Sequence, residues 1–305
     1  MAMLELYRSS VQTWETDGMG HMNVQFYSEK ATSALASLSI ALGHGRDAIS
    51  QTGARLVADD HHIRFLREQR PGAPIFIRGG VVDADPNRLT CYFEMVNTVS
   101  GDVAATFFAH ASLRSDQDRS QVPISDALIS KAKTLRVEVP SHGNPRGLTL
   151  SPPRAAPTPH EAEEMGLITT FQGEVLRDWC VQGDFLATRR YMSIVSDSIP
   201  NLLALTRGDD RSKDSTTGGA ALEYRFVYRR APRHGDVLTL RSGLKEVTDK
   251  TYTWAHWLFD VETGACVATA EAVAIALDLV ARKAIPIPEE MKAGLKKFVV
   301  AGLGV

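Results

Sequence analysis

Two halves of the 305-residue sequence repeat one another, and this duplication limits the possible folds more than any other feature. The segment Ile63–Leu66 (IRFL) matches Tyr224–Val227 (YRFV) at an offset of 161 residues, because 225 − 64 = 161. Residues 98–106 match residues 261–269 at an offset of 163, because their shared glycine gives 264 − 101 = 163. A repeat of this length indicates two copies of a whole domain and excludes a solenoid of small repeats.

Each copy combines one long helix with several strands. In the first copy, apolar residues at helical spacing predict a helix from about Asn23 to Leu42, which ends near Gly43 and Gly45. A short strand at Val11–Trp14 is expected before it. Four further strands are predicted after it, at His61–Leu66, Ile75–Val82, Leu89–Asn97 and Val103–Leu113. A helix followed by an antiparallel meander is an α+β pattern.

The second copy has the same order of elements. Its helix is predicted from about Phe185 to Leu205, with Pro200 inside it as a kink. We therefore expect a first domain at residues 1–115 and a second domain at residues 166–305. Residues 116–165 form the predicted connector, with a helical segment near Ile124–Leu135 and then a tract rich in proline. A short surface helix is expected at Glu289–Phe298.

The composition and the charge narrow the class of protein. The chain has 44% hydrophobic and 23% charged residues, as in soluble globular proteins, and its formal net charge is −2, so no global field attracts nucleic acid or anionic lipid. No run of about 18 apolar residues and no signal-peptide pattern occurs, so we expect no membrane span. Three scattered cysteines fit a reducing compartment, and we expect a cytoplasmic protein.

The turn before the first helix contains the main candidate site. Asp17 and His21 flank two glycines, and Asn23 is a good N-cap for the helix. A helix N-terminus presents unpaired N–H groups, so the backbone near His21, Met22 and Asn23 is a candidate oxyanion hole. The alternative interpretation is an ordinary turn, in which the histidine is a capping or surface group.

This pattern resembles the hotdog-fold thioesterases, in particular the branch of 4-hydroxybenzoyl-CoA thioesterase and related acyl-CoA and acyl-ACP thioesterases. The matching residues are Asp17–Asn23 (DGMGHMN) followed by Tyr27, together with the strand segment His62–Phe65. The resemblance implies two tandem hotdog domains, each an antiparallel sheet wrapped around a long central helix. Two copies in one chain give the double-hotdog arrangement, which is also compatible with a homodimer of such chains.

The resemblance also implies an activity, the hydrolysis of an acyl-CoA or acyl-carrier-protein thioester. Asp17 would act as the nucleophile or as the base for a water, His21 would position the thioester or cap the turn, and Asn23 is favoured as a structural N-cap. Coenzyme A would be part of the substrate, and no separate cofactor is expected. Tyr27 is expected to pack in the core. The alternatives are a non-hydrolytic acyl-thioester binder, a hydratase-like enzyme on the same fold, and a structural module.

The second copy lacks these residues. Its corresponding turn, Trp179–Leu186, has no aspartate four residues before a histidine, and Asp184 is favoured as a helix N-cap. Asp197 is similar in placement to a carboxylate on the central helix of another hotdog branch, or it bonds backbone groups freed by Pro200. We therefore expect one competent site per chain.

Four arginines are candidates for binding the phosphates of coenzyme A. Arg64 and Arg225 recur at equivalent positions, which indicates a framework role or a contact to a phosphate-bearing ligand. Arg229 and Arg230 belong to a basic run that is either solvated surface or part of a phosphate site. We expect no metal site at Asp59–His62, because adjacent histidines on a strand point to opposite faces.

Overall fold

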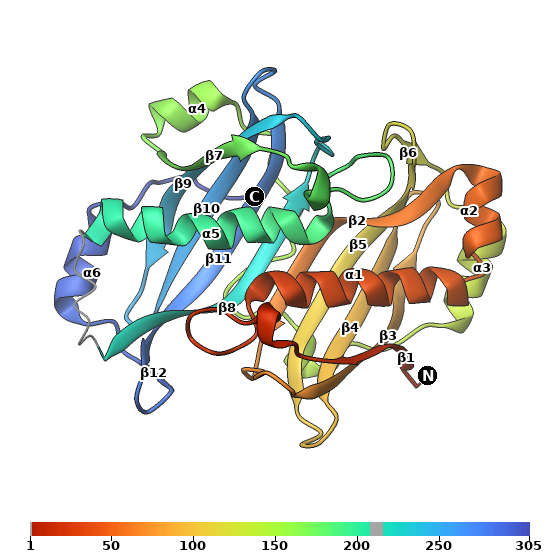
Figure 1. The fold of residues 1–305 in the computed structure, drawn as a ribbon, viewed down its shortest axis with the longest axis horizontal. Coiled ribbons are helices and arrows are strands. Elements are labelled where there is room, and N and C mark those ends of the chain that lie inside the picture. The colour runs from red at the N-terminus through yellow and green to blue at the C-terminus, as the bar shows by residue number, and fades with distance from the viewer. Residues whose placement is uncertain (1, 208–215) are drawn as a thin grey trace. The chain divides into compact units, whose positions relative to one another are not determined.

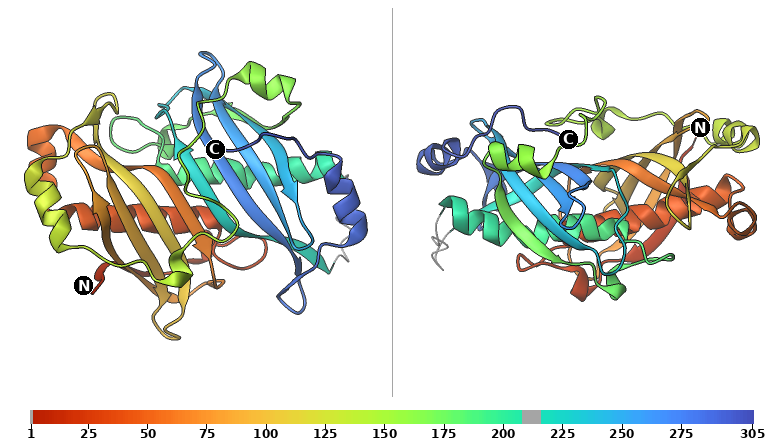
Figure 2. Two further views of the ribbon diagram at one scale, coloured as in Figure 1. Left: turned by 180° about the vertical axis from the view of Figure 1, so that it is seen from behind. Right: turned by 90° about the horizontal axis from the view of Figure 1, so that it is seen from above.

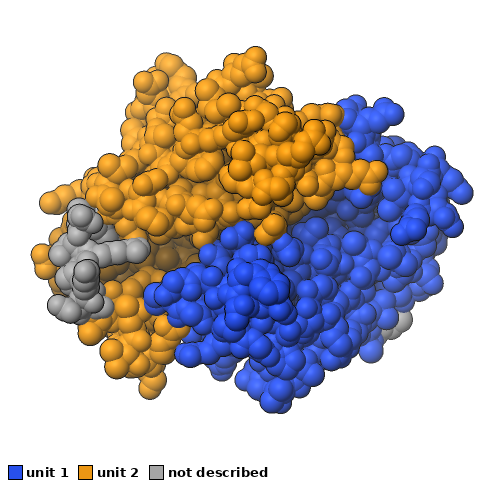
Figure 3. Space-filling model, viewed as in Figure 1, with its two compact units in different colours: residues 1–145 blue, residues 146–305 orange. Residues whose placement is uncertain are grey.

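A computed structural model describes residues 2–207 and 216–305 of the chain. They divide into two units, unit 1 at Met1–Pro145 and unit 2 at Arg146–Val305, which are coloured separately in Figure 3. The division falls inside the segment 116–165 that the sequence predicts as a connector. Each unit has an antiparallel sheet and one long helix, so the α+β prediction is confirmed.

Unit 1 follows the predicted order of helix and meander (Figure 1). Its strands are β1 (Leu4–Ser10), β2 (Ala54–Phe65), β3 (Pro74–Ala84), β4 (Leu89–Asn97), β5 (Val103–Ser115) and β6 (Gln121–Val122). Its helices are η1 (Thr13–Glu15), α1 (Val24–Ala41), α2 (Arg46–Thr52), α3 (Asp126–Thr134) and η2 (Ser141–Gly143). The strand order is β1-β3-β4-β5-β2, and β6 pairs with β5.

The strand predicted at Val11–Trp14 is wrong. The first strand ends at Ser10, and Thr13–Glu15 forms the 3-10 helix η1 instead. The cause is local hydrogen bonding, since Glu15 N donates to Gln12 O at 3.1 Å and Glu15 Oε2 accepts from Gln12 N at 2.9 Å. These two bonds curl the chain before it reaches the glycine turn.

Unit 2 repeats this arrangement. Its strands are β7 (Ile168–Glu174), β8 (Thr217–Tyr228), β9 (Val237–Val247), β10 (Thr251–Asp260), β11 (Cys266–Asp278) and β12 (Lys283–Ile285). Its helices are α4 (Pro159–Glu164), η3 (Arg177–Trp179), α5 (Thr188–Arg207) and α6 (Glu289–Lys296). The order β7-β9-β10-β11-β8 corresponds strand for strand to that of unit 1, and β12 pairs with β11. The duplication read from the sequence is therefore confirmed in three dimensions.

The core of unit 1 lies between α1 and the sheet. The helix begins after the N-cap Asn23 and ends at Leu42, beyond which Gly43 takes a φ of +85°. Its buried face is made mainly of small and aliphatic residues, among them Ala31, Ala34, Leu35 and Leu38. The small side chains let α1 lie close across the sheet, as Figure 1 shows.

A strap, which we define as residues 136–154, covers the opposite face of each sheet. In unit 1 it passes over β2 to β5 on the side away from α1, visible from behind in Figure 2. In unit 2, the buried carboxylate of Glu223 accepts three successive strap N–H groups, from Arg146, Gly147 and Leu148, at 2.8 to 3.1 Å. The predicted connector is thus a hydrogen-bonded part of both units rather than a loose linker.

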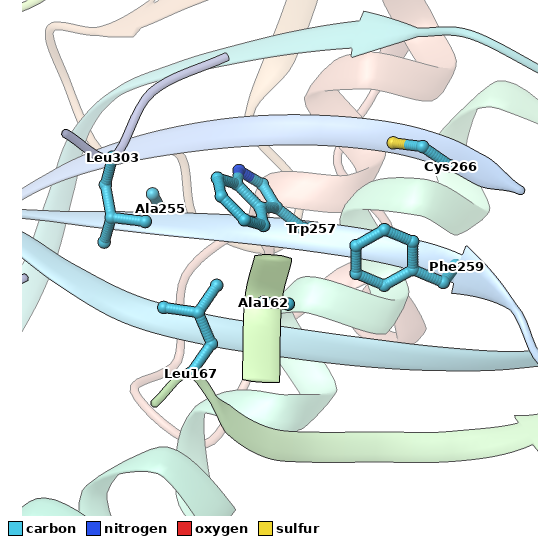
Figure 4. Close-up of a cluster of buried hydrophobic side chains, with 7 residues drawn as sticks. All are labelled: Ala162, Leu167, Ala255, Trp257, Phe259, Cys266 and Leu303. Atoms are coloured by element: carbon cyan, nitrogen blue, oxygen red, sulfur yellow. The ribbon is translucent and has the colours of Figure 1, made fainter. Parts of the chain in front are cut away.

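On the strap side of unit 2, an apolar cluster fixes α4 and the C-terminal segment (Figure 4). It contains Ala162, Leu167, Ala255, Trp257, Phe259, Cys266 and Leu303. The indole Nε1 of Trp257 donates to Gly304 O at 3.0 Å, which satisfies its one polar atom. None of the helices in residues 2–207 and 216–305 has the length and the hydropathy needed to cross a membrane.

Candidate functional site

The loop between η1 and α1, residues 16–23, has a fixed backbone. An isolated bridge joins Thr16 to Met22, and Asp17 N donates to His21 O at 3.0 Å. Gly20 N donates back to Asp17 O at 3.0 Å, and Gly20 has a φ of +75°, which favours glycine. The loop therefore holds Asp17 and His21 at the two ends of a tight turn.

The Asp17 carboxylate lies at the centre of this turn. Its Oδ1 accepts from Met19 N at 2.8 Å, and its Oδ2 lies 3.3 Å from His21 Nδ1. The other ring nitrogen of His21, Nε2, is 3.7 Å from Glu68 Oε1. The side chain of Asp17 is 28% exposed, so the carboxylate is oriented by the loop and still accessible to a ligand.

The start of α1 corrects the predicted oxyanion hole. Met22 N donates to Gln69 O at 2.7 Å and Asn23 N donates to Glu15 O at 2.8 Å, so neither group is free for a ligand. Asn23 Oδ1 caps Gln25 N at 3.1 Å, which confirms Asn23 as an N-cap. Among the residues that the structure describes, Val24 N has no acceptor. The N–H of Val24 is therefore the donor left open in the first turn of α1.

A buried ion pair, which sequence reasoning missed, anchors the loop to α1. Lys30 Nζ lies 2.6 Å from Glu15 Oε1, and the two side chains are only 3% and 6% exposed. The pair connects η1 to the second turn of α1, on either side of the Asp17 loop. Two charged residues fifteen positions apart gave no motif, so only the folded chain reveals the pair.

Tyr27 packs in the core, as predicted. Its ring meets Phe65 of β2 edge to face, with ring centroids 5.0 Å apart. Burial raises the pKa of the Tyr27 phenol above its ordinary value, so the hydroxyl stays neutral. Tyr27 therefore stabilises the seat of α1.

The corresponding loop of unit 2 has the same backbone with different side chains. Val181 N donates to Phe185 O at 2.8 Å, and Ala187 N donates to Trp179 O at 2.9 Å. Both bonds repeat those of unit 1 at an offset of 164 residues, since 181 − 17 = 164 and 187 − 23 = 164. Asp17, His21 and Asn23 thus correspond to Val181, Phe185 and Ala187, none of which ionises.

Two predicted residues of unit 2 have other roles. The assignment of Asp184 as an N-cap is wrong, because α5 begins only at Thr188. Asp184 instead takes the left-handed position of the turn, with a φ of 58°, where unit 1 has Gly20. Asp197 lies on an exposed face of α5 and accepts from Ser193 Oγ at 3.1 Å, so it is not buried in the core of unit 2.

With this geometry established, comparisons with known proteins identify the family. The profile of the thioesterase-like superfamily matches residues 11–132 and 181–295, which are most of the chain. The chain belongs to the thioesterase-like superfamily. The two matched segments each contain one long helix and its meander, as expected for a duplicated thioesterase-like domain. A comparison with curated protein sequences gave no match.

Solved structures share the double arrangement of this thioesterase-like chain. A protein assigned as an oleoyl thioesterase from Lactobacillus plantarum has a TM-score of 0.66 and 16% identity, over 88% of this chain and 95% of its own. An acyl-ACP thioesterase from Bacteroides thetaiotaomicron gives 0.64 and 11%, over 88% and 96%. A 12:0-ACP thioesterase from Umbellularia californica gives 0.63 and 12%, over 88% and 92%. At these identities the likeness shows the fold, and the predicted double-hotdog fold is confirmed.

Three of the four candidate phosphate-binding arginines of this thioesterase-like chain contact the strap. Arg64 donates to His142 O at 2.7 Å and to Asn144 O at 2.5 Å. Arg225 donates to Thr149 O at 2.8 Å, and Arg229 donates to Arg154 O at 3.0 Å. The framework role proposed for the recurring pair Arg64 and Arg225 is therefore observed, and phosphate binding stays a prediction.

The remaining polar candidates also have structural partners. Arg230 pairs with Asp260 at 2.9 Å, next to the turn at Thr263. In the Asp59–His62 segment, His61 packs against Phe107, and burial lowers the pKa of His61 to about 4. Within residues 2–207 and 216–305, no group of three or more histidine, cysteine or acidic side chains is placed to hold a metal ion.

Proposed function

We propose that the chain hydrolyses acyl thioesters and that Asp17 supplies the carboxylate. The observation that carries this proposal is the pairing of a loop-held, partly exposed carboxylate with an open N–H at the start of the next helix. Asp17 has two ordered contacts in the loop, and Val24 N is the unpaired donor among the described residues of the first turn of α1. Thioester hydrolysis needs both a group that activates attack and a donor for the developing oxyanion.

Two routes use the same residues. In one, Asp17 takes a proton from a water whose oxygen attacks the thioester carbonyl. In the other, Asp17 attacks that carbon itself, and water then opens the mixed anhydride. In both, the carbonyl oxygen becomes negative and the C–S bond breaks, so that the thiol leaves and a carboxylic acid forms. The N–H of Val24 donates to the oxyanion, with the positive end of the α1 dipole behind it.

His21 and Asn23 act as positioning residues in this scheme. His21 Nδ1 holds the Asp17 carboxylate at 3.3 Å, while its other nitrogen faces Glu68. Asn23 caps α1 and fixes the first turn that presents Val24 N. Replacement of either residue should lower the rate less than replacement of Asp17, because neither side chain contacts the reacting carbon.

The proposed substrates are acyl groups carried by coenzyme A or by acyl carrier protein. Membership of the thioesterase-like superfamily and the acyl-ACP thioesterases among the structural neighbours support this class. Coenzyme A would enter as part of the substrate. A panel of saturated acyl-CoA and acyl-ACP substrates, from short to long chains, would define the preferred carrier and the chain length.

The decisive experiment compares Asp17→Asn with a matched control, Asp184→Asn. The control changes an aspartate in the equivalent loop of unit 2, where the proposal assigns no chemistry. We expect Asp17→Asn to lower kcat/KM by about 10²- to 10⁴-fold, and Asp184→Asn to leave it unchanged. Unchanged hydrolysis by folded Asp17→Asn protein would remove Asp17 from the mechanism. An Asp197→Asn variant in the same series tests whether α5 contributes a carboxylate.

A hydratase is the second candidate, because Asp17 and His21 are in contact at 3.3 Å. An aspartate and a histidine together can add water across an enoyl thioester. Parallel assays with a saturated acyl-CoA and the 2-enoyl-CoA of the same length separate the two reactions. Release of free thiol identifies hydrolysis, whereas loss of enoyl absorbance without free thiol identifies hydration.

A further inference from the structure

A buried polar trio lies between the sheet of unit 2 and α5. Ser242 Oγ of β9 lies 2.8 Å from His256 Nδ1 of β10 and 2.9 Å from Thr170 Oγ1 of β7. Thr170, Ser242 and His256 are 2%, 0% and 1% exposed. The three hydrogen-bonding side chains therefore form one chain that runs across neighbouring strands, with no contact to solvent.

The packing of the fold does not require this trio, because unit 1 has apolar residues at all three positions. Ser242 pairs with His256 in the register at which Gly79 pairs with Phe93, each at an offset of 163 residues. Thr170 takes the strand bulge that Leu6 takes in unit 1. A Cβ on Gly79 would lie 2.5 Å from Phe93 Cδ1, so the larger ring needs the glycine, and the smaller imidazole leaves room for a serine.

The hydrogen atoms of the trio can be assigned by counting acceptors. If Thr170 donates to Ser242 and Ser242 donates to His256 Nδ1, the only atom left without a partner is Nε2 with its hydrogen. In the reverse direction, the Thr170 hydroxyl also lacks an acceptor among the described residues. The first arrangement leaves fewer buried groups unsatisfied and is therefore favoured. It makes His256 Nε2–H a donor.

The His256 ring lines a cavity beneath α5. The other walls are apolar and include Tyr191 and Val195 of α5, Phe226 of β8, and Leu240 and Leu258. The space is about 180 Å³ with its open side included, but only about 10 Å³ admits the centre of a water molecule. Burial lowers the pKa of His256 to about 3, so the ring is neutral, and no residue that lines the cavity is charged.

We propose that unit 2 binds, between α5 and its sheet, a neutral apolar molecule that carries one acceptor oxygen, and that His256 Nε2–H donates to this oxygen. A keto or hydroxyl group on an alkyl chain has this chemistry. A carboxylate does not fit, because its charge would be buried without a cation. The site is independent of the hydrolysis proposed for unit 1.

The first test uses the unmodified full-length chain with ¹⁵N-labelled histidine. Titration with 2-hexanone should shift the Nε2 resonance of His256, and hexane should not. The ketone should bind about tenfold more tightly than hexane, as expected for one hydrogen bond made in an apolar site. Equal affinities for the two probes, or an Nε2–H that contacts only a bound water throughout the titration, would overturn the proposal.

The second test replaces the trio by the residues of unit 1, as Thr170→Leu/Ser242→Gly/His256→Phe. This variant should fold and should bind 2-hexanone no better than hexane. Asp17→Asn is the control, and it should bind the ketone as the unmodified chain does, whether or not it hydrolyses thioesters. Retention of the ketone preference by the triple variant would show that the oxygen is bound elsewhere, as would a failure of Asp17→Asn to bind the ketone.

Discussion

The loops that precede α1 and α5 share one backbone and differ in almost every functional side chain. Both begin with a 3-10 helix, close with a short bridge, and place one residue in the left-handed region, Gly20 in unit 1 and Asp184 in unit 2. In unit 1 the loop is tied to the helix by the ion pair between Lys30 and Glu15. In unit 2 the guanidinium of Arg190 lies 5.0 Å from the Trp179 ring instead.

This difference separates what the loop needs to fold from what it needs for chemistry. The backbone bonds of the turn form equally with Val181 and Phe185 as with Asp17 and His21. The ionisable side chains in unit 1 are therefore not required by the turn, which supports a role in binding or catalysis. The interiors differ in the opposite sense, since the polar trio is in unit 2.

The largest effect is expected when the unit 1 loop receives the unit 2 side chains. The variant Asp17→Val/His21→Phe/Asn23→Ala should keep the fold, because these residues are accommodated on the same backbone in unit 2. Its thioesterase activity should fall by at least about 100-fold, since the carboxylate is lost. Steady-state assays, with circular dichroism to confirm folding, check this.

The reverse exchange is the control for the loop variant. Val181→Asp/Phe185→His/Ala187→Asn in unit 2 should leave the activity of unit 1 unchanged. Loss of activity in this second variant would contradict the assignment of catalysis to unit 1 alone.

The next largest effect concerns the buried ion pair. Position 30 corresponds to Ile194 in unit 2, because 194 − 30 = 164. Lys30→Ile leaves the Glu15 carboxylate buried without a cation, so we expect the free energy of unfolding to fall by about 3 to 5 kcal/mol. Glu15→Leu/Lys30→Ile removes both charges and should cost less. Urea denaturation measures both, and a double variant less stable than the single one would contradict this account.

A third prediction compares the two interiors through pH. The folded-state pKa of His256 is about 3, below the ordinary value of 6.5, so the unfolded chain binds the proton more tightly. Stability is therefore lost as the pH falls from about 6.5 toward 3. Ser242→Gly/His256→Phe, which gives unit 2 the unit 1 pair, should flatten this fall by up to about 1.4 kcal/mol per pH unit. Parallel slopes for the two proteins would disprove it.

The sequence predicted those features that depend on short-range pattern and on the repeat. The limits of α1, the four strands after it and the N-cap Asn23 all follow from periodicity and capping chemistry. The strand β1 was missed because Gln12 and Glu15 curl the chain where an apolar run suggested extension. The Lys30–Glu15 pair, the Val24 donor and the strap contacts of Arg64 and Arg225 depend on the path of the backbone, which no motif records. The trio in unit 2 was within reach, because aligning the two copies places Gly79 and Phe93 against Ser242 and His256.

The smallest effect concerns the helix caps. Asn23 Oδ1 accepts from Gln25 N at the start of α1, whereas the equivalent Ala187 has no side-chain acceptor to offer α5. Asn23→Ala should therefore lower the free energy of unfolding by about 1 kcal/mol, and Ala187→Asn should raise it by a similar or smaller amount. Thermal denaturation of the two variants measures both signs. If Asn23 acts only as a cap, Asn23→Ser should restore both stability and activity, because serine caps a helix equally well. Restored stability with activity still lost would instead assign the Asn23 amide a direct contact with the substrate.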